Sequence, residues 1–309
     1  MLIGVVSMAI CYKPIHQLIK LNMADDFEVK KPANNIRVMS WNVEHFDILE
    51  HKTHPEVKVK MLDLINKYMP DVACFQEMVG GDEDPSAINY VPTIAAKLGF
   101  SQYFYSYNKK DDFDNKHHFG IIIFSRYPII KTATIENDPF DYNTTFQQID
   151  IVKNTDTIRV LNVHLQSLKF SNTNKQYIEN PTLQSENDIE KSKNIISKLK
   201  TGFLKRKRQS DYIRAAMDKS PYPLIVCGDF NDVPNSYAYN TIGKNMLNAF
   251  VEKGSGIGRT FSAISPTLRI DNIFVSPTFQ VQQYIRIPKI MSDHYPIITD
   301  IKIERNKGF

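Results

Sequence analysis

Cysteine is scarce in this chain of 309 residues: there are three, and they stand far apart at Cys11, Cys74 and Cys227. A disulfide scaffold needs several cysteines that can pair, and a structural zinc site needs cysteines or histidines clustered at short spacing. Neither pattern is present, so a disulfide-stabilised protein and a structural zinc protein are both excluded. Cys74 and Cys227 lie inside apolar runs, which predicts buried thiols that pack as small hydrophobic side chains.

Two common catalytic motifs are also missing. No glycine-rich loop ends in Lys followed by Ser or Thr, so hydrolysis of nucleoside triphosphates on a P-loop is unsupported. A serine hydrolase of the α/β class would place its nucleophile in a G-x-S-x-G turn. The nearest string, Gly254-Ser255-Gly256, has the wrong spacing.

Long apolar segments are absent as well. Residues 1–12 are uncharged and largely apolar, but a membrane-spanning helix needs about 20 such residues. The basic start and cleavage site of a secretory signal are missing too. We expect an N-terminal arm or linker over residues 1–35 and one catalytic domain over residues 36–305. The expected location is the cytoplasm, or a membrane if residues 1–12 end a longer hydrophobic segment.

The net charge of +4 is small and is compatible with an anionic partner such as a phosphate ester. Lys and Arg residues are frequent between Lys191 and Arg214, with Lys205-Arg206-Lys207-Arg208 at the centre. The apolar residues of this segment recur at helical spacing. This predicts an amphipathic helix. Its basic face is either simply solvated or binds nucleic-acid phosphates or an anionic membrane surface. No feature indicates an obligate protein partner.

Short β-rich apolar runs alternate with longer helical stretches from Ile36 onward. The predicted strands are Ile36–Asn42, Val72–Glu77, Gln102–Tyr107, Phe119–Ser125, Thr145–Val152, Thr157–His164, Pro223–Gly228, Arg269–Val275 and Ile297–Ile303. The predicted helices are Glu56–Met69, Pro85–Leu98 and Glu186–Lys219. Mixed hairpins and crossovers favour an α/β fold of two packed mixed β-sheets flanked by helices.

Many of these strands share one feature, a polar side chain suited to catalysis at or just beyond one end. A lone acid after a strand is usually a turn former or a helix cap. Repeated instances in one chain point to an assembled site, because a rigid sheet fixes the side chains that it carries. The residues concerned are Asn42, Glu77, His164, Asp229, Asn231, Asp271, Asp293 and His294.

These residue types suit one chemistry. Carboxylates and amides are the ligands of hard cations, so the sequence predicts Mg²⁺ or Mn²⁺ as the cofactor. Such an ion can polarise a phosphoryl oxygen. A histidine that is held by a carboxylate can transfer protons near neutral pH.

Seven segments resemble the endonuclease/exonuclease/phosphatase superfamily and occur in its order. They are SWNVE, PDVACFQE, FGIIIFSRYPI, NVHLQS, CGDFNDVPNS, RIDNIF and SDHYPI, which together span residues 40–297. The resemblance implies a four-layered α/β sandwich and a metal-dependent phosphoesterase that uses the DNase I-like fold.

The resemblance also implies roles for individual residues. Glu77 is similar to the principal metal ligand, and Asp293 lies near the metal. Asp229 resembles the acid that positions or deprotonates the attacking water. His294 resembles the histidine at the scissile phosphate, which acts as a base or as an electrostatic stabiliser, and Asp271 resembles the carboxylate that orients it.

Further roles follow from the same comparison. Asn42 resembles the amide beside the metal and the phosphate, and Asn231 the amide that binds the phosphate. His164 resembles a second phosphate-side histidine, and Glu44 falls where some members carry an acid near the metal. Outside the resemblance, Arg259 and His118 are candidate substrate contacts.

Some features depart from the family pattern. Met78-Val79-Gly80-Gly81 replaces the segment in which pancreatic-type deoxyribonucleases carry a DNA-gripping arginine. The glutamate that pairs with the second histidine of those enzymes has no counterpart near His117–His118. We therefore expect a phosphodiesterase, and a nuclease-like activity is only slightly favoured over two alternatives. The alternatives are a lipid-headgroup or inositol-type phosphoesterase near a membrane, and an inactive binding module of the same fold.

Overall fold

The computed structural model describes residues 11–12, 14–20, 22, 26–50, 52–81, 89–112, 117–136, 145–168, 170–179, 186–265 and 267–304. Residues 1–10 of the apolar N-terminal segment, residues 85–88 of the predicted helix Pro85–Leu98 and residue 305 of the predicted domain lie outside the described residues. Within the described part, no helix is both long and apolar enough to cross a membrane.

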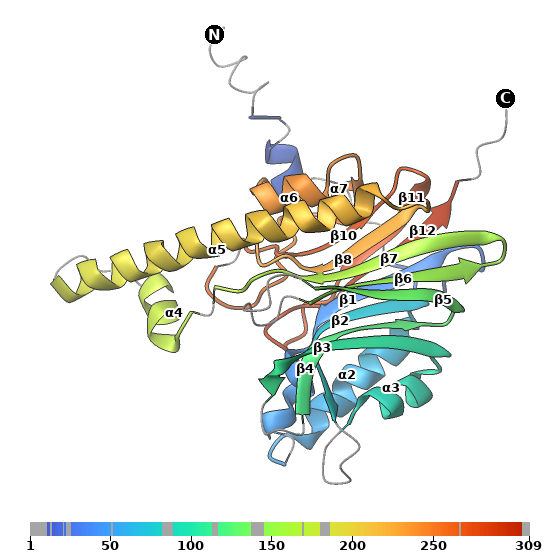
Figure 1. Ribbon diagram of the computed structural model, residues 1–309, viewed down its shortest axis with the longest axis horizontal. Helices are drawn as coiled ribbons and strands as arrows, with labels where there is room; N and C mark the ends of the chain where they lie inside the picture. The colour runs from blue at the N-terminus through green and yellow to red at the C-terminus, as the bar shows by residue number, and fades with distance from the viewer. Residues whose placement is uncertain are drawn as a thin grey trace, which may run out of the picture.

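Two six-stranded β-sheets form the centre of the molecule (Figure 1). The first sheet has the order β11-β12-β1-β2-β4-β3 and the second the order β5-β6-β7-β8-β10-β9. The strands of the first sheet are β1 (Ile36–Asn42), β2 (Val72–Gly81), β3 (Gln102–Asp112), β4 (His117–Ser125), β11 (Phe279–Arg286) and β12 (Ile297–Ile303). Those of the second are β5 (Ile129–Glu136), β6 (Thr145–Lys153), β7 (Asp156–His164), β8 (Leu224–Asp229), β9 (Leu247–Asn248) and β10 (Asp271–Val275).

Helices cover the outer faces of both sheets (Figure 1). In chain order the helices are η1 (Glu44–Glu50), α2 (Pro55–Tyr68), α3 (Val91–Leu98), α4 (Asn172–Glu179), α5 (Glu186–Asp218), α6 (Tyr237–Ile242) and α7 (Ala249–Lys253), of which α4 packs against α5 rather than on a sheet. Side chains of α2 and α3 pack on the first sheet, and side chains of α5 and α6 pack on the second. The predicted four-layered α/β sandwich is therefore confirmed.

The alternation of side chains along β1 shows how the layers are held. Ile36 and Val38 lie in the core between the two sheets, whereas Met39 and Trp41 lie in the core beneath α2 and α3. Since successive side chains of a strand point to opposite faces, Asn42 is directed to the space between the sheets. Cys74 and Cys227 are buried in this inter-sheet core, as predicted.

The sequence did not predict three of the strands, which are β5, β9 and β11. Each lies at an edge of its sheet. An edge strand has only one neighbour and tolerates polar residues, so its apolar pattern is weak. The helix predicted to begin at Pro85 begins at Val91 within the described residues.

The described part of the N-terminal arm packs against the domain. Lys20 and Gly256 exchange backbone hydrogen bonds of 2.9 and 2.7 Å, and the Arg269 guanidinium donates to the carbonyl of Leu18 at 3.1 Å. The division into an arm over residues 1–35 and a catalytic domain over residues 36–305 stays a prediction.

Candidate active site

The space between the sheets becomes polar at one end of the strands. The inner-face positions of β1 run from Ile36 to Asn42, and those of β7 run from Ile158 to His164, so both begin apolar and end polar. Beneath these ends, the Gln76 amide donates to the Asn162 side-chain oxygen at 2.7 Å. This buried amide pair joins the two sheets and supports the polar layer above it.

A row of polar side chains crosses the second sheet. The strand register pairs His164 with Asp229 across β7 and β8, and Asp229 with Asp271 across β8 and β10. Residues that are paired in register on one face lie close together. The Nε2 atom of His164 is 3.6 Å from Asp229 Oδ2 and, within the described part of the chain, has no hydrogen-bond partner.

Glu77 reaches this row because of a β-bulge in β2. The pairing with β4 shifts between Phe75 and Met78, and Glu77 has a φ of 51°. A bulge inserts an extra residue and re-aims side chains. The Glu77 carboxylate accepts from the Asn42 amide at 3.2 Å. Burial raises the pKa of Glu77, but His164, His45 and the Asn42 amide outweigh it and bring this pKa below its ordinary value.

His294 forms a buried pair with Asp271. Its Nδ1 atom lies 2.9 Å from Asp271 Oδ2, and the two side chains are 5% and 1% exposed. Burial opposes the charged ring, but the carboxylates of Asp271, Asp229 and Asp293 dominate, so the pKa of His294 is well above its ordinary value. The Ser292 hydroxyl accepts from the His294 backbone amide at 3.0 Å and donates to the Asn42 carbonyl at 2.7 Å. This hydroxyl ties the histidine loop to β1.

Asp229 accepts three hydrogen bonds from its neighbours in the site. Its Oδ1 accepts from the Asn231 backbone at 2.7 Å, and its Oδ2 accepts from the side chains of Asn231 at 3.1 Å and Asn42 at 3.2 Å. Burial raises the pKa of Asp229, and the nearby Asp271 adds to this effect, while His294 and His164 oppose it. Asn231 also donates to the Leu165 carbonyl at 2.9 Å, which fixes its orientation.

Asp293 and Glu44 form a more open acidic edge. The Asp293 side chain is 36% exposed, and its backbone amide donates to Glu44 Oε2 at 2.9 Å. Burial, together with the like charges of Glu44, Glu77 and Asp229, raises the pKa of Asp293 to about 6 against the opposing effect of His294. Carboxylates that repel one another in this way are relieved by a bound cation.

The donor set fits a hard divalent cation. Asp229, Asp271 and His294 each offer one atom, and these atoms lie within 4.8 Å of one another. Because Asp271 and His294 are already bonded to each other, the more open carboxylates are better candidates for holding the cation. Glu77 and Asp293 are 25% and 36% exposed and would hold the ion, with Asn42 and Glu44 beside them. Oxygen ligands of this kind suit Mg²⁺ or Mn²⁺.

Two candidate substrate contacts lie outside this cluster. The His118 ring stacks on Tyr107 at a centroid distance of 4.2 Å. Arg259 donates to the carbonyl of Phe261 at 2.7 Å and to that of Ser262. Neither of these contacts involves Asp229 or His294. The substrate-binding roles of His118 and Arg259 therefore remain predictions.

Sequence reasoning missed three supporting residues. Ser292 could have been found, because it precedes the Asp293-His294 pair directly. His45, whose Nε2 lies 3.7 Å from Glu77 Oε2, depends on the positive φ angles of η1. Phe261, whose ring lies 4.9 Å from the His294 ring, comes from a loop without a recognisable motif.

The family model described as the Endonuclease/Exonuclease/phosphatase family matches residues 39–294, which include every member of this polar cluster. This chain belongs to the endonuclease/exonuclease/phosphatase family. Membership of this family makes it a metal-dependent phosphoesterase. No match was found among curated protein sequences.

Solved structures of similar fold agree with this family. An endonuclease/exonuclease/phosphatase from Bacteroides vulgatus has a TM-score of 0.62 at 16% identity, with 87% of this chain and 99% of that chain covered. The human Nocturnin catalytic domain with bound sulfate has a TM-score of 0.60 at 18% identity, with coverage of 91% and 97%. D. rerio TDP2 with a single-strand DNA product has a TM-score of 0.60 at 14% identity, with coverage of 87% and 99%.

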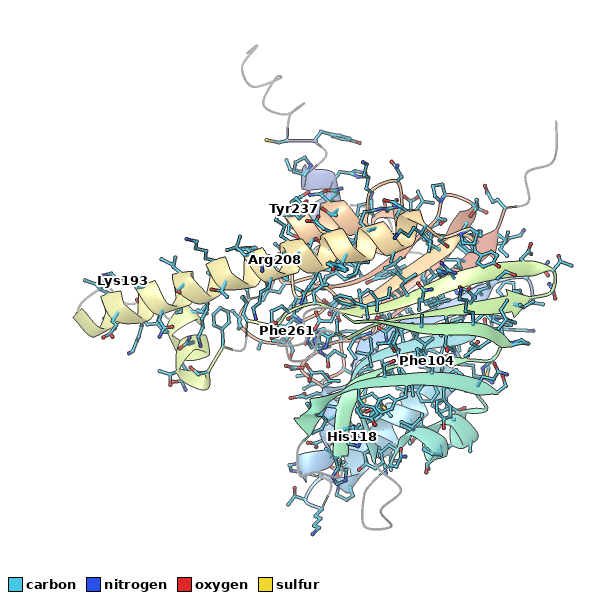
Figure 2. The ribbon with its side chains drawn as sticks, in the orientation of Figure 1. Phe104, His118, Lys193, Arg208, Tyr237 and Phe261 are labelled. Carbon is cyan, nitrogen blue, oxygen red and sulfur yellow. The ribbon has the colours of Figure 1, made fainter. Side chains whose placement is uncertain are left out.

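A cavity of about 440 Å³ opens onto this polar cluster. The polar part of its lining is Glu77, Arg206, Asp229, Asn231, Asp232, Asp293 and His294 with Ser167. The rest is apolar and comes from Leu168 and Phe170 before α4, from α4 and α5, from Val233, and from the segment between Phe261 and Ile270. Figure 2 shows Phe261 below the middle of α5, under Arg208.

Gly228 controls the position of Asp229, and its substitution should be costly. Its φ is 144°, and an added Cβ would lie 1.8 Å from the Val163 carbonyl oxygen on β7. We expect Gly228→Ala to lower the free energy of unfolding by about 3 kcal/mol or more, through strain and separation of β7 from β8. Urea denaturation measures this change.

Gly256→Ala is the matched control. Gly256 also has a positive φ, of 72°, but no atom lies within 4 Å of its added Cβ. Only the backbone cost of about 1–2 kcal/mol should remain. Equal losses in the two variants would show that the approach of Gly228 to Val163 contributes nothing.

Proposed function

We propose that the protein hydrolyses a phosphodiester by in-line attack of water on phosphorus. The observation that supports this most is the surroundings of Asp229 Oδ2. It accepts from two side-chain amides, and the Nε2 atoms of His164 and His294 each stand 3.6 Å away. Hydrogen-bond donors thus converge beside one buried carboxylate, which is the arrangement needed around a phosphate and its attacking water.

The residues divide the work by position. Asp229 orients the water and accepts its proton, and its raised pKa makes it a stronger base than an exposed aspartate. His164 is placed to donate to a phosphate oxygen, because its Nε2 has no hydrogen-bond partner within the described part of the chain. Asn231 donates to Asp229 and to the Leu165 carbonyl, and so holds the Asp229 carboxylate in position. His294, held by Asp271, places positive charge next to the phosphate as the transition state forms.

A divalent ion held by Glu77 and Asp293 would polarise a phosphoryl oxygen and offset charge on the leaving oxygen. Water adds to phosphorus, one ester P–O bond breaks, and the alcohol leaves with a proton. The products are a phosphomonoester and an alcohol.

Two substrate classes follow from different observations. Nuclease-like activity is supported by the fold shared with a relative solved with a single-strand DNA product. A lipid-type phosphodiester is favoured by the largely apolar lining of the cavity that reaches the site. Apolar walls of this kind bind the apolar part of a ligand.

Metal dependence tests the proposed reaction. With methyl para-nitrophenyl phosphate as a generic diester, we expect activity to disappear in a chelator and to return with Mg²⁺ or Mn²⁺. The rate of nitrophenol release measures this, and the ion should also raise the melting temperature. The monoester para-nitrophenyl phosphate, which lacks the methyl group, tests the preference for diesters over monoesters and should react more slowly. Full activity in chelator would contradict the proposed mechanism.

A further inference from the structure

The cavity beside the catalytic residues has more apolar wall than a hydrated phosphate requires. One wall is formed by Ile195, Leu199 and Phe203 of α5, and the opposite wall includes Phe261, Ile264 and Leu268. Ligand cavities are lined in this manner where the ligand itself carries apolar surface.

Helix α5 carries further apolar side chains into solvent. The helix extends beyond the sandwich, with α4 packed against its projecting end (Figure 1). Ile189, Ile196 and Phe203 follow one another at seven-residue spacing and are 49%, 64% and 49% exposed. At about 100° per residue this spacing gives a single stripe, which adjoins the face that bears Leu199.

The part of α5 that follows Glu190, and that carries Ile196 and Phe203, is strongly basic. Residues 191–208 contain eight Lys and Arg and no Asp or Glu. Lys193, Lys200 and Arg208 are exposed, and Lys193 and Arg208 point away from the sheets in Figure 2. A basic helix with an exposed apolar stripe matches an interfacial helix, which lies on an anionic lipid surface.

The basic run Lys205–Arg208 is not one continuous patch, which corrects the reading of it as a single surface. Arg206 is 2% exposed and donates to Asp232 at 3.1 Å. Lys207 pairs with Asp211 at 2.9 Å. The exposed charge is therefore spread along the projecting half of α5 rather than concentrated at these four residues.

We propose that the substrate is a phospholipid-type phosphodiester, taken from an anionic lipid surface on which α5 docks. The phosphate lies at Asp229 and His294, and the first part of the acyl chain lies between α5 and the segment from Phe261 to Leu268. This assignment rests on the proposed phosphodiester hydrolysis. A nucleic acid would match the cations but would leave the aliphatic wall and the exposed isoleucines without a ligand, because nucleic-acid grooves rely on stacking side chains.

The cavity is tested with two soluble diesters that differ only in alkyl length, methyl and hexyl para-nitrophenyl phosphate, assayed with Mg²⁺. Each buried methylene is worth about fourfold, so a partly buried hexyl chain should raise kcat/KM by about 10-fold or more. Leu199→Asn should remove this preference, and the ratio of kcat/KM for the hexyl ester to that for the methyl ester measures the loss. Tyr212→Ser, at a residue of α5 that is 59% exposed and lies outside the cavity lining, is the control.

The two ideas fail differently in this assay. If the methyl ester is hydrolysed but the hexyl ester gains nothing, the lipid assignment is overturned and the phosphodiesterase stands. If neither ester is hydrolysed in the presence of Mg²⁺ or Mn²⁺, the proposed function itself fails.

Docking is tested by sedimentation with vesicles of phosphatidylcholine and phosphatidylglycerol in equal parts. Each Lys near such a surface contributes about 1 kcal/mol, so the double variant Lys193→Gln and Lys200→Gln should bind at least about 10-fold more weakly. The control removes the same charge from α2 on the opposite outer layer, with Lys60→Gln and Lys67→Gln. Unchanged vesicle binding, or a loss confined to single-stranded DNA binding, overturns the proposal.

Discussion

His294→Ala should lower kcat on the best phosphodiester substrate by about 10³-fold, with little change in KM. The imidazolium lies beside the Asp229 carboxylate and acts on charge that develops in the transition state, so its loss falls mainly on turnover. Steady-state kinetics at saturating metal measures the effect. His54→Ala, at a side chain that is 58% exposed, is the control and should be close to normal.

The contribution of Asp271 can be separated from that of His294. Asp271 touches the ring at 2.9 Å and acts through it, so Asp271→Asn should lower kcat by less. The double variant should be no slower than His294→Ala alone, because two residues that act as one unit are not additive. A further loss in the double variant would give Asp271 an independent function, and near-normal turnover of His294→Ala would make the site assignment wrong.

Glu77→Gln should reduce activity by at least about 100-fold and also abolish stabilisation by Mg²⁺. The amide keeps the shape of the side chain but removes the charge that would hold the ion. For the native protein, an ion at about 100 times its Kd should add about 2.7 kcal/mol to the free energy of unfolding. Thermal unfolding with and without Mg²⁺ measures this independently of turnover.

Glu56→Gln, on the exposed start of α2, is the matched control for the change of charge. Its activity and its response to Mg²⁺ should equal those of the native protein. If Glu77→Gln were stabilised by Mg²⁺ as much as the native protein, the ion would have to be held elsewhere.

The positions of most site residues were predictable because they depend on strand ends. Alternation along β1 and β7 directs Asn42 and His164 to the inner face, and both facts can be read from the apolar pattern. The approach of Asp229 to Asp271 was less accessible. It depends on the antiparallel register of β8 and β10, two strands separated by some forty residues of chain.

Other features follow from geometry that a pattern of residue types does not carry. Glu77 ends the predicted strand, yet β2 continues to Gly81 and the bulge alone directs the carboxylate to the site. The buried state of Arg206 within a basic run depends on Asp232, which faces it from another segment. Both outcomes are set by tertiary contacts rather than by local sequence.

The row formed by His164, Asp229 and Asp271 has a consequence for how this chain can diverge. The three residues sit at matched levels on adjacent strands, so their proximity depends on the register of these strands and not on the lengths of the segments that connect them. A single-residue insertion or deletion within β8 is a different event, because it would rotate Asp229 to the opposite face and place a neighbour in the catalytic layer. Descendants of this gene should therefore accumulate length changes in the connecting loops, while the three strands keep a constant count of residues.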